Sequence, residues 1–144
     1  MTNAYPIPDV ALDDRLGWVK PSSGKDEIIL ATAAGQAIHF KESQLRPMGR
    51  TASGVKAIRL KKGDFVAGLD IIKESAAAKT RDSKLLIVTE NGFTKQTPLK
   101  DYKIQSRGGS GIKTAKINAK TGNIISAKII GAENMMPLSA MLVP

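Results

Sequence analysis

The octapeptide IILATAAG at residues 28–35 recurs 57 residues later as LLIVTENG at residues 85–92. Each copy is an apolar run that leads into Thr-x-x-Gly, followed by a basic stretch and by Arg-x-x-x-Gly before a β-branched residue. Five identities or close matches share this one offset: Thr32, Gly35, Arg50, Gly54 and Val55 recur as Thr89, Gly92, Arg107, Gly111 and Ile112. A match of this length without a gap predicts a repeat protein built from supersecondary units, as in propellers and solenoids.

Positive charge follows the repeat. The chain carries 22 Lys and Arg residues against 13 Asp and Glu residues, a formal net charge of +9. Residues 36–62 hold seven basic residues and one acidic residue, and residues 93–120 do the same. Because equivalent positions of a repeat occupy equivalent places, we expect one basic band with Arg50 and Arg107 on the same side. Such a band indicates a polyanion such as DNA or RNA as partner, and the alternative is a solvated face that only aids solubility.

The secondary structure predicted from the pattern is all-β. Short β-rich runs are separated by Gly, Asn, Asp and Ser, and helical periodicity is nearly absent. Asn91-Gly92 is a strong signal for a tight hairpin, and Lys62-Gly63-Asp64 and Thr121-Gly122-Asn123 form a second matched pair of turns. Each repeat then contains two hairpins, which is the content of a propeller blade. The expected strands span residues 28–32, 36–41, 54–60, 65–72, 85–89, 93–97, 111–117 and 123–130.

The expected organisation is two complete four-stranded blades with parts of flanking blades. Its segments are the end of a preceding blade and a linker at 1–25, a first blade at 26–73, a polar linker at 74–84, a second blade at 85–131 and the start of a further blade at 132–144. A closed propeller needs about four or more blades. We therefore expect the ends of this piece to expose unpaired strand edges and to promote self-association.

Several functional classes find no support in the residues. There is no cysteine, and no apolar run approaches the length that crosses a bilayer. His39 is the only histidine and has no neighbouring ligands in the sequence, so neither a metal site nor a cofactor is expected. The glycines at 108–111 lack the Gly-Lys-Ser/Thr ending of a nucleotide-binding loop. The sequence contains no nucleophile–base pair that would indicate an enzyme. Its composition fits a cytoplasmic protein.

Residues 28–35, 46–58 and 62–64 together resemble a blade of the C-terminal domain of the bacterial DNA gyrase A subunit, and residues 88–97 and 102–112 resemble another blade. The related domain of the topoisomerase IV A subunit is the less favoured alternative. The resemblance implies a β-pinwheel, a propeller-like disc whose blades exchange a strand or hairpin. It also implies binding and wrapping of double-stranded DNA without sequence specificity, in support of negative supercoiling. The implied partners are DNA, the ATPase subunit of an ATP-dependent bacterial topoisomerase, and the remainder of its A subunit, of which this chain is a non-catalytic part.

The resemblance also selects candidate site residues. The family's wrapping signature is Gln-Arg-Arg-Gly-Gly-(Arg/Lys)-Gly, and its nearest match is a degenerate box with serine at two basic positions: Gln105, Ser106, Arg107, Gly108, Gly109, Ser110 and Gly111. Arg50 and Arg107 lie beside glycines and are expected either to hold a phosphate or to cap a carbonyl in a tight connection. The full set of candidate phosphate contacts is Lys41, Arg46, Arg50, Lys56, Arg59, Lys95, Lys100, Lys103, Arg107 and Lys113. The alternative function is a non-catalytic propeller whose basic rim contacts an acidic protein.

Overall fold

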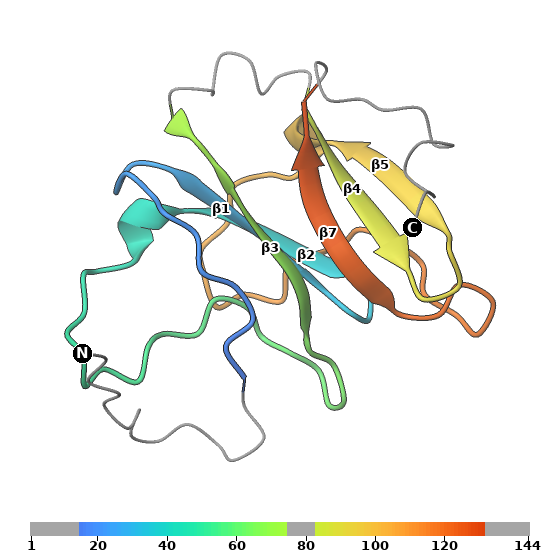
Figure 1. Ribbon diagram of the computed structural model, residues 1–144, viewed down its shortest axis with the longest axis horizontal. Helices are drawn as coiled ribbons and strands as arrows, with labels where there is room; N and C mark the ends of the chain where they lie inside the picture. Colours follow the sequence, from blue (N-terminus) through green and yellow to red (C-terminus); the bar gives the residue numbers. More distant parts are fainter. Residues whose placement is uncertain (1–14, 75–82, 132–144) are drawn as a thin grey trace, which may run out of the picture.

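The computed structural model describes residues 15–74 and 83–131, and within them the fold is all-β (Figure 1). Two short 3₁₀ turns follow the hairpins, η1 (Glu42–Gln44) and η4 (Leu99–Asp101). No helix in this part of the chain is long and apolar enough to cross a membrane. The strands are β1 (Glu27–Thr32), β2 (Gln36–Lys41), β3 (Val66–Ile72), β4 (Lys84–Thr89), β5 (Thr94–Pro98), β6 (Ile112–Lys113) and β7 (Ile124–Ile130).

The strands form two antiparallel sheets in the orders β3-β1-β2-β6 and β5-β4-β7. The first predicted hairpin of each repeat is confirmed, since β1 pairs with β2 and β4 pairs with β5 across equivalent turns. The second predicted hairpin of each repeat is wrong, because β3 pairs with β1 and β7 pairs with β4. Gly35 and Gly92 close these turns at φ values of 97° and 82°, a region that favours glycine. The internal repeat is therefore structural as well as sequential: β1, β2 and β3 correspond to β4, β5 and β7.

The strand composition of the sheets differs from the expectation of two blades with four strands each. Residues 54–60 form no strand, and the strand expected at 111–117 is reduced to β6. β6 pairs with β2, so the fourth strand of the first sheet comes from the second repeat, and the second sheet has three strands among the described residues. Residue alternation indicates that a segment is extended, but it does not identify the strand with which the segment pairs.

Some of the expected segments fall outside the described residues. These are positions 1–14 of the preceding blade and linker, positions 75–82 of the polar linker, and the further blade at 132–144. Lys84, the last residue of the expected linker, lies in β4.

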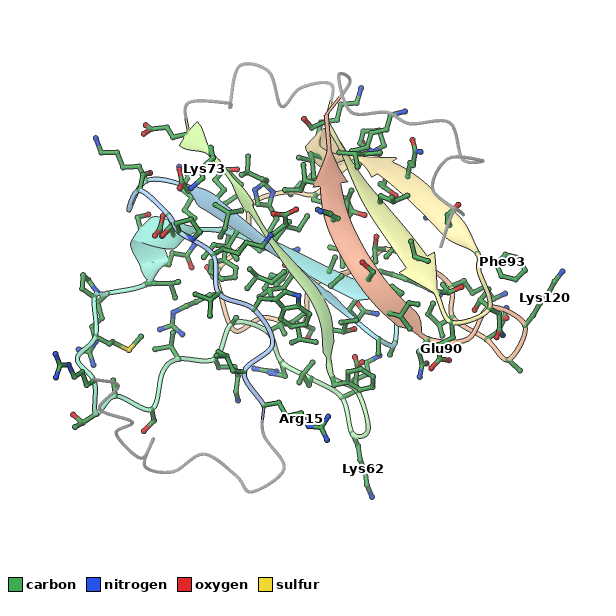
Figure 2. All side chains as sticks on the ribbon, in the orientation of Figure 1. Arg15, Lys62, Lys73, Glu90, Phe93 and Lys120 are labelled. Carbon is green, nitrogen blue, oxygen red and sulfur yellow. The ribbon has the colours of Figure 1, made fainter. Side chains whose placement is uncertain are left out.

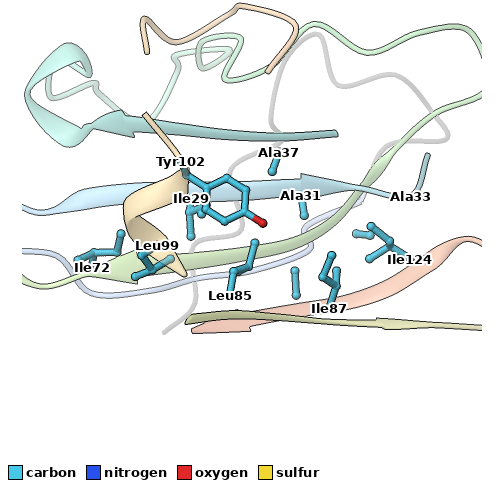
Figure 3. Packing of buried hydrophobic residues seen from close by; sticks show 12 residues of the cluster. Ile29, Ala31, Ala33, Ala37, Ile72, Leu85, Ile87, Leu99, Tyr102 and Ile124 are labelled. Carbon is cyan, nitrogen blue, oxygen red and sulfur yellow. The ribbon is translucent and has the colours of Figure 1, made fainter. Parts of the chain in front are cut away.

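The main hydrophobic core lies between the two sheets (Figure 3). Ile29 and Ala31 of β1 face Leu85 and Ile87 of β4, and each of these four side chains is only 1 % exposed. Leu99, Tyr102 and Ile124 of the second repeat complete the cluster. The opposite face of the first sheet carries a second cluster formed by Ile28, Leu30, Ile38, Phe40 and Ile58. Burial of apolar surface in the main core, which has side chains of both repeats, holds the two repeats together.

The two sheets approach most closely where β3 lies beside β7 (Figure 1). A Cβ atom added to Gly68 would lie 2.7 Å from the Cβ atom of Ala127 and 2.8 Å from its backbone nitrogen. Two residues further along, Asp70 Oδ2 accepts a hydrogen bond of 2.9 Å from the backbone N–H of Ile129. Glycine is thus required at position 68 because of the close approach of the neighbouring strand.

A buried carboxylate ties the segment before β1 to the end of β3. Asp26 accepts hydrogen bonds of 2.9 Å from the backbone N–H of Glu74 and 2.8 Å from that of Ser23. These bonds favour the ionised form, and they lower the pKa of Asp26 to about 2. Lys73 adds an ion pair of 3.5 Å.

Replacing Gly68 by alanine is expected to destabilise the protein by about 1–3 kcal/mol, because the new methyl group overlaps the backbone of β7. Urea unfolding followed by circular dichroism measures the effect. Gly49→Ala is the matched control, since a Cβ there meets nothing within 4 Å. Equal changes in the two variants would show that the approach of β3 to β7 does not limit residue size.

The unpaired edge of β5 is expected to cause the self-association predicted from the sequence. No described strand pairs with this edge, whereas the equivalent edge of β2 is covered by β6. Light scattering should show association that increases with concentration, and Gln96→Pro should reduce it because proline cannot donate a hydrogen bond to a docking strand. A wild-type chain that stays monomeric at high concentration would contradict this expectation.

Candidate nucleic-acid interface

A segment of the second repeat follows the outer edge of the first sheet, and we call residues 102–113 the strap. Ile104 forms a parallel bridge with His39, and the backbone N–H of Gln105 donates a 2.7 Å hydrogen bond to the His39 carbonyl. The strap then turns, and Ile112 and Lys113 pair with Ala37 and Gln36. The strap therefore carries side chains of the second repeat along most of β2.

The degenerate box forms the bend of the strap. Gly108 has a φ of 81°, and its N–H donates a 2.6 Å hydrogen bond to the carbonyl of Ala57. The carbonyl of Gly109 accepts a 2.8 Å hydrogen bond from the N–H of Arg59. At Gly111, with a φ of 71°, a Cβ would overlap the carbonyl oxygen of Ala37. The box glycines thus allow the strap to pack tightly against both β2 and residues 57–59.

Arg107 contacts the first repeat through carbonyl oxygens. Its Nη1 donates to the carbonyl of Lys56 at 3.2 Å, and its Nε lies 3.4 Å from the carbonyl of Gln44. Its backbone N–H donates to Gln44 Oε1 at 2.8 Å. Of the two roles expected for this arginine, carbonyl capping is the one seen here, and phosphate binding stays a prediction. Arg107 as a residue is nonetheless only half-buried.

The strap brings several candidate cations of the two repeats together. The Arg107 guanidinium contacts the backbone carbonyl of Lys56, and the backbone N–H of Arg59 is bonded to Gly109 of the box. Lys113 lies on β6, and Lys95 Nζ donates a 2.8 Å hydrogen bond to the carbonyl of the next residue, Thr114. The exposed loop at 46–55 adjoins this region in the chain and includes Arg46 and Arg50.

Three candidates lie toward the other end of β2. Lys41 ends β2 and is the register partner of Glu27. Lys100 lines a hollow of about 230 Å³ together with Glu27 and His39. Lys103 is exposed and precedes Ile104 on the strap. Lys41 and Lys100 therefore both have the acidic residue Glu27 as a neighbour. This distinguishes them from the cations around the box.

A buried polar clamp fixes the strap, and no feature of the sequence predicts it. The His39 ring nitrogens lie 2.6 Å from Glu27 Oε2 and 2.8 Å from the Tyr102 carbonyl oxygen. The Tyr102 hydroxyl is hydrogen-bonded to Thr114 Oγ1. His39, Tyr102 and Thr114 are all buried. The sequence led us to expect no metal site at His39, and it gave no local signal of the contact with Tyr102, which lies 63 positions away.

Comparison with known proteins agrees with this geometry. The family described as DNA gyrase C-terminal domain, beta-propeller, matches residues 26–73 and 83–130, which are the two repeats. The chain belongs to this family. The resemblance stated from the sequence and the propeller-type fold are thereby confirmed.

Relatives of this gyrase C-terminal domain chain include the A subunit of DNA gyrase from Staphylococcus epidermidis, 45 % identical over 125 residues, and that from Staphylococcus aureus, 46 % identical over 125 residues. Each alignment covers 86 % of this chain, which spans 13 % and 14 % of those relatives. Among solved structures, the C-terminal domain of DNA topoisomerase IV matches with a TM-score of 0.65 and 26 % identity, over 74 % of this chain and 32 % of that one. A DNA gyrase A C-terminal domain shares the fold, with a TM-score of 0.58 and 21 % identity, over 80 % of this chain and 34 % of that one.

Tyr102→Phe is expected to destabilise the protein by about 1–3 kcal/mol, because Thr114 Oγ1 loses its buried partner. Hydrogen exchange should become faster at the backbone N–H of Gln105, which donates a hydrogen bond to the His39 carbonyl. Lys103→Ala, at an exposed neighbouring position, is the control and should change stability by no more than about 0.5 kcal/mol. A Tyr102→Phe protein as stable as the control would show that the clamp does not hold the strap.

Proposed function

We propose that this gyrase C-terminal domain chain binds double-stranded DNA through the phosphates and does not read the base sequence. In a parent gyrase A subunit, such binding would wrap DNA and support negative supercoiling. The observation that carries the proposal is the strap: the Arg107 guanidinium donates to the Lys56 carbonyl at 3.2 Å, so residues of the two basic windows lie side by side. Family membership supports the same conclusion.

Electrostatics favours a polyanionic ligand at this edge. Lys56, Arg59 and Lys113 are exposed, and their side chains are available to neutralise phosphates. The like charges repel one another in the free protein, and a phosphate backbone lying along the edge relieves that repulsion. With only 4 % aromatic residues, the chain is poorly suited to binding single strands by stacking on bases. Contacts to phosphates position a duplex without specifying its sequence.

The proposal gives the chain no chemistry of its own. It is an accessory DNA-binding part of an ATP-dependent topoisomerase, in the bacterial cytoplasm where the DNA lies. Its protein partners are the ATPase subunit together with the remainder of the A subunit. The 26–73 and 85–131 units act as two adjoining blades of a larger disc, and the degenerate box serves the junction between them.

Binding of a labelled random-sequence duplex, measured by fluorescence anisotropy over a range of salt concentrations, tests the proposal. About six phosphate contacts give a plot of log K against log salt with a slope near −5. Lys56→Ala and Lys113→Ala should each weaken binding to any sequence and make the slope shallower by about 1. Lys128→Ala, on β7 and outside both basic windows, is the control.

Two results would contradict the proposal. One is binding that does not respond to salt, and the other is loss of affinity in the control equal to that in the two strap-edge variants. Absence of DNA binding together with salt-sensitive binding of an acidic protein would favour the propeller as a protein-interaction module.

A further inference from the structure

Gln44, an exposed residue of η1, contacts the box through both ends of its side-chain amide. Its Nε2 donates a 3.1 Å hydrogen bond to the carbonyl of Gln105, and its Oε1 accepts one of 2.8 Å from the backbone N–H of Arg107. An ionised carboxylate cannot make both contacts, because it has no donor. The Gln44 side chain therefore pairs with the backbone of the strap as a neighbouring strand would, although it belongs to the first repeat.

The backbone of Gln44 also reaches the Arg107 side chain. The carbonyl oxygen of Gln44 lies 3.4 Å from Arg107 Nε, and the carbonyl oxygen of Lys56 accepts a 3.2 Å hydrogen bond from Nη1. A guanidinium has N–H donors on three nitrogen atoms, and no acceptor within residues 15–74 and 83–131 contacts Nη2. The carbonyls carry no net charge, so Arg107 keeps its positive charge while its direction is fixed.

Lys62 is an ordinary surface cation by comparison. Its side chain extends from the turn before β3 into solvent (Figure 2), and no residue of the described part of the chain forms a hydrogen bond or ion pair with it. Ordering such a side chain on a ligand costs conformational entropy at the moment of binding. Arg107 loses less, because its planar group is already oriented by the first repeat.

We propose that Gln44 is a positioning residue for phosphate binding by Arg107. It holds the backbone at residues 105–107 and the guanidinium so that Nη2 is presented to a phosphate of the duplex. This inference rests on the proposed function, and it adds that the phosphate site is composite. The second repeat supplies the cation, and the first repeat orients it. Because Gln44 is uncharged, its substitution tests orientation without removing charge from the protein.

Gln44→Met is the variant that tests this role. Methionine has nearly the same length, but it has no donor and its sulfur is only a weak acceptor. Binding of a labelled random-sequence duplex is measured by fluorescence anisotropy over a range of salt concentrations. The variant has the same net charge as the wild type. Its plot of log K against log salt should nonetheless be shallower by about 1, with affinity about fivefold lower, because one phosphate contact is lost.

Three further measurements separate positioning from a merely structural role. Arg107→Ala should give the same shallower slope, and adding Gln44→Met to it should cause no further loss, because Gln44 acts through Arg107. Without DNA, nuclear magnetic resonance should show faster exchange of the Arg107 Nε–H in Gln44→Met than in the wild type. Ser43→Ala, at the exposed neighbouring position of η1, is the control and should change neither the slope nor this exchange. Urea unfolding should give equal midpoints for Gln44→Met and Ser43→Ala, since both residues are exposed.

The outcomes for this inference and for the proposed function are distinct. If the wild type binds DNA and Gln44→Met keeps its slope, the role of Gln44 is overturned and the proposed function stands. A loss caused by Gln44→Met that is as large in the Arg107→Ala background as in the wild type has the same meaning. Tighter binding by Gln44→Met also overturns the inference, since the carbonyl contacts would then withhold Arg107 from DNA. A wild type that shows no salt-sensitive binding overturns both.

Discussion

Everything in this structure depends on the pairing of the strap with β2. The first repeat supplies three strands of its sheet, and β6 of the second repeat supplies the fourth. The same pairing buries Tyr102 against Ile29 and Leu85 in the shared core and brings Arg107 to Lys56. A single topological feature thus links the hydrophobic core, the join between blades and the grouping of charge. The two repeats form one structural unit because the sheet of the first repeat includes a strand of the second.

Apolar and polar contacts make different contributions to the join between the two repeats. Apolar burial between β1 and β4 supplies the main attraction, which is strong but non-directional. The buried hydrogen bonds of His39, Tyr102 and Thr114 have defined geometry and would be left unsatisfied by a shifted strap. Close contacts at Gly68 and Gly111 add a steric limit on the same alignment. Together these contacts specify one register of the second repeat on the first.

The sequence predicted the class of fold, the repeat, the first hairpin of each repeat and the family, because these depend on short-range patterns and on one fixed offset. The second hairpin expected in each repeat does not form. The family resemblance implied that blades exchange a strand or hairpin, but the residue pattern did not identify β6 as that strand, since alternation at 111–117 carries no information about the partner strand. For the candidate interface, the grouping of Lys56 and Arg107 was expected from the repeat, but two roles were open for Arg107, and its carbonyl contacts follow only from the fold. The clamp at His39 arises from residues far apart in sequence, and composition alone gives no sign of it.

The borrowed strand also sets an order of events for a chain emerging from a ribosome. Synthesis proceeds from the N-terminus, and domains begin to fold as they emerge. The sheet built from β1, β2 and β3 waits for residues 112–113 before its last edge is closed. The first unit therefore completes its sheet only after most of the second repeat has been translated.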